Sequence, residues 1–393
     1  MTSVPPESER PIVLIGPVSE DPTESVSGVN RAFIAGLEDR YRFLPLLATR
    51  TRGNTRQAKL TLFNAFYFLQ QCIRWLGHLV FRRPDLAHYA ISHGWAMEKG
   101  LFLMKLARLF GVRTLGHLHS GGFPDHWKSL PRWRRRLAES EFDKLDGMVL
   151  ASEWWKGEIV QHVPFPRERL HVVNNPIEYG FEARALEFPA RRESMIVLGI
   201  GIMSRAKGVM EILEAAGEVS RKTPLDLRLA GAEREPGILE TVRETVAAES
   251  LQDVVTVTPS VSDEEKERLF RQCSILLLPS HYENFPIVVL EAAAAGMAII
   301  TTRVGAVPEF FEDGVSALFI DIGDSQQLAK AIYSLVRDPD KCVRLGESAR
   351  EVFREKLARQ AIMASLDKVY AALLKDAEKK RPNRPPDDFI KLD

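Results

Sequence analysis

The chain has 393 residues, of which 45% are hydrophobic and 27% charged, and its formal net charge is zero. This length and apolar content are enough for two full cores, so we expect two domains rather than one. The balanced charge excludes the overall basic character of a nucleic-acid-binding protein, and no nucleic-acid partner is expected.

The cysteines and the amino-terminal residues bear on the cellular compartment. Cys72, Cys273 and Cys342 are scattered, lack metal-ligand spacing and cannot form a disulfide framework, which is typical of a reducing compartment. The first residues, MTSVPPESERP, contain no apolar stretch of the kind found in secretory signals. We therefore expect a cytoplasmic protein.

Short apolar runs alternate with helical patterns along the whole chain, which predicts βαβ units and parallel sheets. In the first half, strands are expected at residues 11–16, 41–46, 86–91, 112–117, 147–151 and 170–174. The second half repeats the pattern at residues 195–201, 225–231, 254–257, 274–279, 297–301 and 317–320. The predicted fold class is α/β, with two Rossmann-like domains in succession.

Composition sets the expected domain boundaries. Residues 181–193 are rich in charge and alanine and are interpreted as a linker between a first domain, 1–180, and a second, 194–350. An apolar stripe at helical spacing predicts one final helix at residues 351–375. The tail, 376–393, combines proline with charge and is expected to be disordered.

The first domain carries a strong local excess of positive charge. Between Arg40 and Arg136 there are eighteen Lys and Arg residues against three acidic ones, and aromatic residues such as Phe66, Phe81 and Trp133 lie among them. Such a surface can rest on an anionic membrane. The alternative is that the aromatic rings are core and the arginines form a solvated rim or bind an anionic acceptor. No apolar run is long enough to span a bilayer.

Two first-domain segments offer candidate binding residues. Gly28 lies in the long loop after the first strand, ahead of a helix expected at residues 31–38, where backbone amides can approach a phosphate or a sugar. A plain helix-capping turn is the alternative. His119 ends a strand and opens a loop of Ser, Gly and Gly, at the sheet edge where ligands bind. His117 and His93 are secondary candidates, and a structural histidine is the alternative for each.

In the second domain, two motifs follow predicted strands. A loop after the strand at 195–201 carries Arg205 and Lys207, which can bind phosphate oxygens, although loop cations are usually just solvated. The strand at 274–279 leads into a turn with Glu283, and Pro286 suits the first position of the next helix. Glu291 then lies about a turn and a half inside that helix. The alternative for Glu283 and Glu291 is two unrelated carboxylates.

Residues 279–296, PSHYENFPIVVLEAAAAG, resemble the donor-site signature of the family 4 glycosyltransferases, which are retaining enzymes of the GT-B fold. The resemblance implies two Rossmann-like domains that face each other across a cleft, with a final helix that crosses back onto the first domain. It also implies a nucleotide-sugar donor in the second domain, with Glu283 beside the sugar and Glu291 at the ribose. Asn284, which often is glycine in the family, Phe285 and Pro286 would lie near the sugar.

Other segments extend this resemblance. Arg205-Ala-Lys207-Gly is similar to the element that binds the diphosphate, and two cations there would stabilise the charge of the leaving group. His119 matches a histidine that faces the donor sugar, and Gly28 matches a Gly-rich first loop. The implied catalytic residues are Glu283, His119, Arg205 and Lys207. With two cations on the diphosphate, no metal and no other cofactor are expected.

The resemblance implies retaining transfer of a sugar to a glycan or lipid-linked acceptor, bound by the first domain, in surface polysaccharide or glycoconjugate synthesis. The enzyme would be cytoplasmic and able to lie peripherally on the inner face of the membrane. One alternative is a nucleotide-sugar epimerase or phosphorylase-like enzyme of the same architecture. The other is a non-catalytic protein that binds sugar nucleotides without turning them over.

Overall fold

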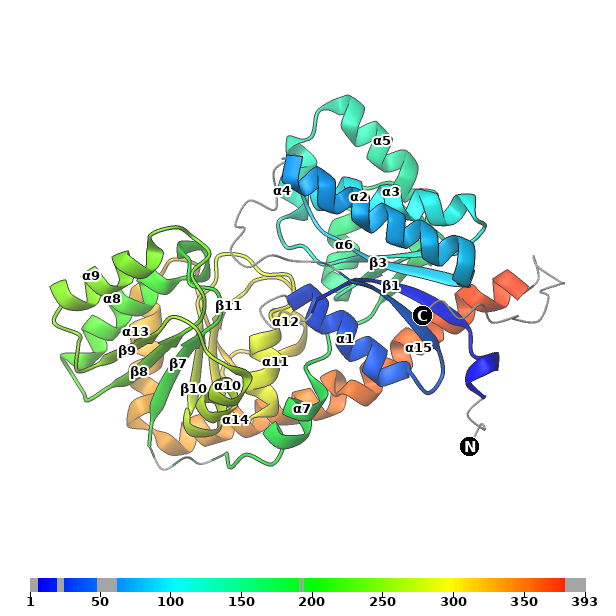
Figure 1. The fold of residues 1–393 in the computed structure, drawn as a ribbon. Coiled ribbons are helices and arrows are strands. Elements are labelled where there is room, and N and C mark those ends of the chain that lie inside the picture. The colour runs from blue at the N-terminus through cyan, green and yellow to red at the C-terminus, as the bar shows by residue number, and fades with distance from the viewer. Residues whose placement is uncertain (1–5, 20–24, 48–61, 191, 193, 379–393) are drawn as a thin grey trace.

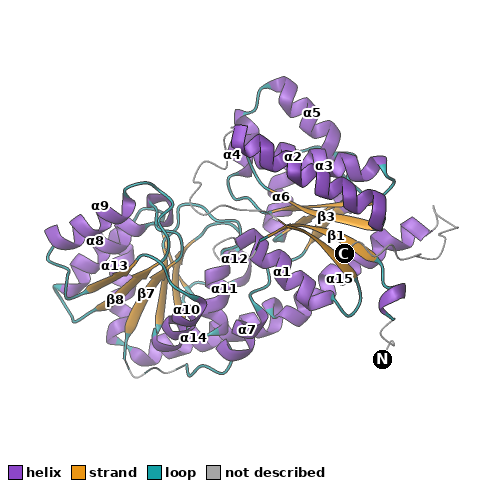
Figure 2. Ribbon diagram, viewed as in Figure 1, coloured by secondary structure: helices purple, strands orange, loops and turns teal. Residues whose placement is uncertain are grey.

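The computed structural model describes residues 6–19, 25–47, 62–190, 192 and 194–378. It contains two sheets, each with helices on both faces and each in its own lobe (Figures 1 and 2). All recorded strand pairs within both sheets are parallel. The tail predicted to be disordered lies largely outside the described residues, which end within a helix at residue 378.

The first sheet has the strand order β2-β1-β3-β4-β5-β6. Its strands are β1 (Ile12–Val18), β2 (Arg42–Leu47), β3 (Leu86–Ile91), β4 (Arg113–Leu118), β5 (Gly147–Leu150) and β6 (Leu170–Val172). The helices of this lobe are α1 (Ser25–Leu37), α2 (Leu62–Gly77), α3 (Trp95–Leu109), α4 (Phe123–Ser129), α5 (Arg132–Phe142) and α6 (Glu153–His162).

The second sheet has the strand order β12-β11-β10-β7-β8-β9. Its strands are β7 (Ile196–Ile200), β8 (Asp226–Ala230), β9 (Val255–Thr258), β10 (Ile275–Leu278), β11 (Ala298–Thr302) and β12 (Leu318–Ile320). The helices of this lobe are α8 (Val209–Ser220), α9 (Ile238–Ala248), α10 (Asp263–Gln272), α11 (Ile287–Ala294), α12 (Val307–Phe310), α13 (Ser325–Arg337) and α14 (Pro339–Val352).

Local sequence explains where these elements begin. Each strand expected from the sequence is present, with ends that differ by no more than two residues. Helix α10 begins with a capping box, in which the Ser262 hydroxyl accepts the Glu265 N–H and the Glu265 carboxylate accepts the Ser262 N–H. Asp338 caps α14 by accepting the Lys341 N–H. Residues 338–340, with the sequence Asp-Pro-Asp, therefore form the start of a helix.

The segment between the two sheets is partly helical. The predicted linker at residues 181–193 begins inside helix α7 (Tyr179–Ala185), whose N-cap is Glu178. The Glu178 carboxylate accepts the backbone N–H groups of Gly180 and Phe181. Phe181 is buried in the core that also contains Phe270 from α10. The sequence missed this helix because alanine and charge also suit an extended linker.

The chain then returns to the first lobe through α15 (Arg359–Glu378), which packs against α1, β3 and β4 (Figure 1). The Tyr41 hydroxyl donates a hydrogen bond of 2.8 Å to Asp367, and the Tyr370 hydroxyl lies 2.6 Å from His88 Nδ1. The prediction of one helix at residues 351–375 is wrong. A π-helical turn at Phe353–Leu357 and an extended Ala358 separate α14 from α15. Phe353 and Leu357 are buried there, and neither proline nor glycine marks the break.

No helix within the described ranges is long and apolar enough to cross a bilayer.

Candidate active site

A cavity of about 1260 Å³ lies between the two lobes and is lined by residues of both. The carboxyl ends of β3 and β4 supply Ser92, His93, His119 and Ser120 from the first lobe. The second lobe supplies the loop after β7 and the loop between β10 and α11. Open α/β proteins bind ligands at the carboxyl edge of the sheet. Here the carboxyl edges of both sheets face the same cavity.

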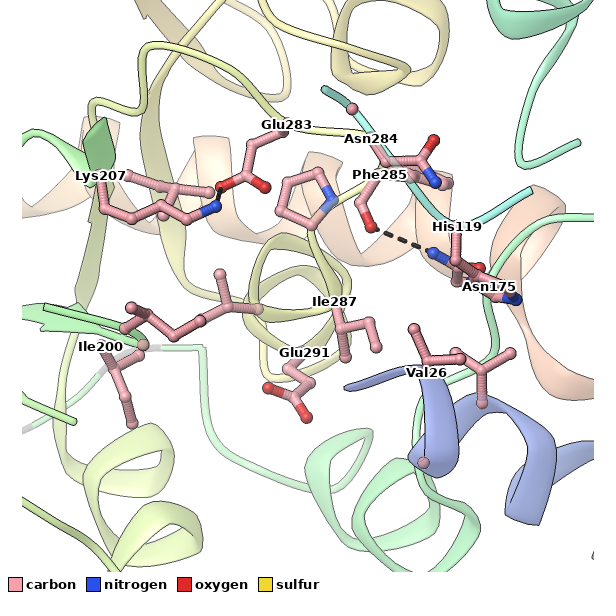
Figure 3. A pocket seen from close by; sticks show the side chains of 18 of the residues that line it. Val26, His119, Asn175, Ile200, Lys207, Glu283, Asn284, Phe285, Ile287 and Glu291 are labelled. Carbon is pink, nitrogen blue, oxygen red and sulfur yellow. Dashed lines mark hydrogen bonds and ion pairs between the residues drawn. The ribbon is translucent and has the colours of Figure 1, made fainter. Parts of the chain in front are cut away.

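Glu283 and Lys207 meet at the second-lobe side of this cavity (Figure 3). The Lys207 ammonium donates a hydrogen bond of 2.5 Å to the Glu283 carboxylate, and the Ser280 hydroxyl donates another of 2.9 Å. Lys207 ends the turn at Arg205–Lys207, and Gly208 follows with a φ of +76°. A Cβ on Gly208 would lie 2.3 Å from the Pro279 carbonyl oxygen, so only glycine lets these two loops approach.

Glu291 lines the same cavity from the first turns of α11, with only 3% of its surface exposed. Its carboxylate forms an ion pair with Lys266 of α10. Burial raises the pKa of Glu291, and the lysine partly offsets that rise. Pro286 is the N-cap of α11, one residue ahead of its predicted place, because the helix begins at Ile287. Asn284, Phe285 and Pro286 also line the cavity.

Arg205 is not brought into the cavity. Its side chain is 58% exposed and forms an ion pair of 3.2 Å with Glu235, whose carboxylate also accepts the Arg205 backbone N–H. Lys207, two residues later, points inward instead. The side chains of Arg205 and Lys207 therefore do not converge on one place in the cavity.

On the first-lobe side, His119 lines the cavity directly after β4. Burial lowers the pKa of His119 to about 4, so the ring is neutral at pH 7. The atom Nε2 is buried, and no described group hydrogen-bonds it. His93 also lines the cavity and lies 2.6 Å from the Ser120 hydroxyl. His117, in contrast, lies in the core beside His88.

Gly28 lines the cavity too, but it does not precede its helix as predicted. Helix α1 begins at Ser25, so Gly28 lies within the first turn. A Cβ there would have open space, with only the Arg31 guanidinium at 3.8 Å. The space around this position accommodates a larger residue, so steric need alone does not explain the glycine.

Sequence reasoning missed a set of bonds from the first lobe to the β10–α11 loop. Trp155 Nε1 donates to the Asn284 carbonyl, and Asn175 Nδ2 donates to the Phe285 carbonyl, each over 3.2 Å. Glu309 of the second lobe accepts the backbone N–H groups of Glu153 and Trp154. These pairs join residues more than 100 positions apart, and no local pattern reveals them.

Two family models match the chain. Residues 185–352 match the model described as glycosyl transferases group 1, and residues 35–180 match the model described as glycosyltransferase family 4. The chain is a family 4 glycosyltransferase of the GT-B fold. Membership of this family identifies the protein as an enzyme, a glycosyltransferase, and excludes the epimerase alternative.

Curated relatives of this glycosyltransferase are transferases and synthases. It is 27% identical to a D-inositol 3-phosphate glycosyltransferase of Pseudarthrobacter chlorophenolicus, over 68% of this chain and 67% of the relative. An alpha-maltose-1-phosphate synthase of Mycolicibacterium smegmatis is 29% identical over 66% of this chain and 72% of the relative.

Solved structures agree on the fold of this glycosyltransferase. Anabaena HepE, solved in complex with UDP, covers 92% of this chain and all of its own, with a TM-score of 0.69 at 14% identity. Sucrose-phosphate synthase from Thermosynechococcus elongatus covers 93% of this chain and all of its own, with a TM-score of 0.71 at 18% identity. At these identities the likeness concerns the architecture.

No group of three or more His, Cys, Asp and Glu side chains is placed to hold a metal ion within the part of the chain that is described.

Proposed function

We propose that this glycosyltransferase moves a sugar, with retention of configuration, from a nucleotide sugar to a glycan or lipid-linked acceptor in surface polysaccharide or glycoconjugate synthesis. One observation carries the proposal. An ammonium, Lys207, is held 2.5 Å from Glu283 in a cavity that both lobes line, with Glu291 in the same cavity. Structures of similar fold were solved with UDP and UDP-glucose, which supports a nucleotide-sugar donor.

In this proposal, the nucleotide-sugar donor contacts Lys207, Glu283 and Glu291. Glu291 accepts hydrogen bonds from the ribose hydroxyls, and Lys207 binds the diphosphate. Lys207 has three N–H donors, so the bond to Glu283 leaves others for phosphate oxygens. The leaving diphosphate gains negative charge as the glycosidic bond breaks, and a fixed cation stabilises that charge more in the transition state than in the ground state. Arg205 contributes only at longer range from its pair with Glu235.

The proposed sugar site lies between Glu283 and His119. Two donors, Lys207 and Ser280, engage Glu283 Oε1, which weakens this carboxylate as a nucleophile. This favours front-face attack by the acceptor hydroxyl, whose proton passes to the departing phosphate oxygen. Neutral His119 lies beside the proposed sugar site. The proposed reaction uses no metal and no cofactor.

The test has two steps. First, thermal melting with uridine, guanosine and adenosine diphosphate sugars identifies the donor, because a ligand that binds only the folded state raises the melting temperature. Second, the release of the nucleoside diphosphate is measured with and without glycan and lipid-linked acceptors, and the anomeric configuration of the product is determined by NMR. We expect acceptor-dependent release and a retained anomer. An inverted product, or donor binding with no turnover on any acceptor, would refute the proposal.

We also propose that α2 and α5 form a membrane-contact face on a cytoplasmic enzyme. Trp75 and Trp127, two other aromatic residues between Arg40 and Arg136, are buried core residues. Other apolar side chains are exposed on these helices: Phe66, Leu69 and Ile73 on α2, and Trp133 and Leu137 on α5. Arg132 and Arg136 are exposed beside Trp133. Exposed aromatic and aliphatic groups with flanking arginines suit the surface of an anionic bilayer.

Vesicle sedimentation tests this face. The protein should bind phosphatidylglycerol vesicles and not phosphatidylcholine vesicles. The double variant Arg132→Ser, Arg136→Ser should lose about 1 kcal/mol of binding free energy per arginine. A matched double variant in the second lobe, Arg243→Ser, Arg268→Ser, removes two exposed arginines and should bind as the wild type does. Equal losses in both variants would show nonspecific charge attraction instead.

A further inference from the structure

The loop between β10 and α11, which carries Glu283, is held by the opposite lobe. Trp155 of α6 donates its indole N–H to the Asn284 carbonyl, and Asn175 donates its side-chain amide to the Phe285 carbonyl. Figure 3 shows the second of these bonds at the wall of the cavity. Trp155 is 2% exposed and Asn175 is 5% exposed, so these donors are shielded from water. Shielded hydrogen bonds define the position of a loop better than exposed ones do.

Backbone packing holds the same loop from two sides. Gly121 of the first lobe lies against the Glu283 carbonyl, since a Cβ there would be 2.9 Å from the carbonyl carbon. Gly305 of the second lobe has a φ of +55°, and its Cβ would be 2.2 Å from the Asn284 carbonyl oxygen. The Ala306 N–H also donates to that oxygen over 2.9 Å. Contacts with both lobes therefore hold the shape of the loop.

The contact is reciprocal. Glu309, in helix α12, accepts the first two backbone N–H groups of α6, which are otherwise without helical partners. A carboxylate is stabilised at this end of the helix. The second lobe thus holds α6, and α6 in turn holds the β10–α11 loop through Trp155.

From these contacts we propose that Trp155 and Asn175 are positioning residues, through which the first lobe sets the sugar-binding half of the donor site. The inference rests on the proposed function, in which the donor is a nucleotide sugar. The residues proposed for the nucleotide half, Lys207 and Glu291, belong to the second lobe. Loosening the loop should therefore weaken binding of the sugar part and leave binding of the nucleoside diphosphate unchanged.

The experiment compares two affinities by titration calorimetry, with UDP and UDP-glucose as the first pair of probes and GDP and GDP-mannose as the second. Trp155→Phe keeps an aromatic ring, although a smaller one, and removes the indole N–H. We expect an unchanged affinity for the nucleoside diphosphate and a nucleotide-sugar affinity lower by about three- to tenfold, the effect of one lost hydrogen bond. The kcat for transfer should fall as well, because the sugar is less well oriented.

Neighbouring residues provide matched controls. Trp154 is 45% exposed, and its ring contacts Trp155 while only its backbone N–H bonds Glu309, so Trp154→Phe should leave both affinities unchanged. Asn175→Ala should repeat the effect of Trp155→Phe. Asn174→Ala is its control, because Asn174 donates to the Ala151 carbonyl within the first lobe. A purely structural role would lower the melting temperature without changing the ratio of the two affinities.

The outcomes separate the two claims. Wild-type protein that binds neither member of either pair, nor any adenosine diphosphate sugar in the melting test, would overturn the proposed function, and the positioning role with it. Wild-type protein that binds both members, with the same ratio of affinities in Trp155→Phe and Asn175→Ala, would overturn the positioning role alone. A lower ratio in both variants and not in their controls would support it.

Discussion

Removing the lysine that pairs with Glu291 should destabilise the protein in a pH-dependent way. Glu291 is buried and its carboxylate forms an ion pair with Lys266, which is 31% exposed. The variant Lys266→Met keeps most of the side-chain length and removes the charge. The carboxylate is then left without its partner, and its pKa rises further above the ordinary value.

The size of the effect follows from burial. Removing one partner of a fully buried ion pair costs about 3–5 kcal/mol. Because Lys266 keeps part of its surface in water, we expect about 2 kcal/mol at pH 8. A carboxyl group whose pKa is raised on folding contributes stability at low pH and loses it as pH rises through the folded pKa. The loss in Lys266→Met should therefore be larger at pH 8 than at pH 5.

Thermal melting of wild type and variant at pH 5 and pH 8 measures this difference. The control is Lys222→Met, which removes a lysine from an exposed pair with Glu218 on α8 and should change the melting temperature little at either pH. An equal loss for Lys266→Met at both pH values would refute the argument from burial. A larger loss of stability at pH 5 than at pH 8 would show that the predicted pH dependence has the wrong sign.

Three further variants test single features of the site. Lys207→Met should lower kcat by about 100- to 1000-fold, as expected for one preorganised group at a developing charge, and wild-type turnover would contradict the role of Lys207. Gly305→Ala should cost about 1–3 kcal/mol in denaturant unfolding, since its φ is +55° and its Cβ would meet the Asn284 carbonyl; unchanged stability would show that the turn relaxes. Glu309→Gln should lower the free energy of unfolding by about 0.5 kcal/mol, because it removes the negative charge at the start of α6. High salt should lower the free energy of unfolding of the wild type in the same way, because it screens that charge.

The sequence predicted the strands and the main site loop because both depend on local patterns. Apolar runs of four to seven residues bounded by turns are found as strands in both sheets. Glu283, Pro286 and Glu291 follow β10 closely in sequence, so their common place at one sheet edge could be derived from the α/β pattern.

Other features depend on contacts between distant residues. Arg205 and Lys207 are two positions apart, and only the position of Glu235, thirty residues later, shows which of them turns outward. The bonds from Trp155 and Asn175 join the two lobes. The break at Ala358 lies beside Phe353 and Leu357, whose side chains are buried in a hydrophobic core. None of these features can be predicted from a short stretch of sequence.

The most direct test of the proposed site compares how UDP and uridine, or the matching pair for the donor found by melting, bind to two variants. Lys207→Met should weaken binding of the diphosphate and leave binding of the nucleoside unchanged, because the lysine is placed at the phosphates. Glu291→Gln should weaken both, because the carboxylate is placed at the ribose. Wild-type affinity for the diphosphate in either variant would contradict the claim that Lys207 and Glu291 bind one donor.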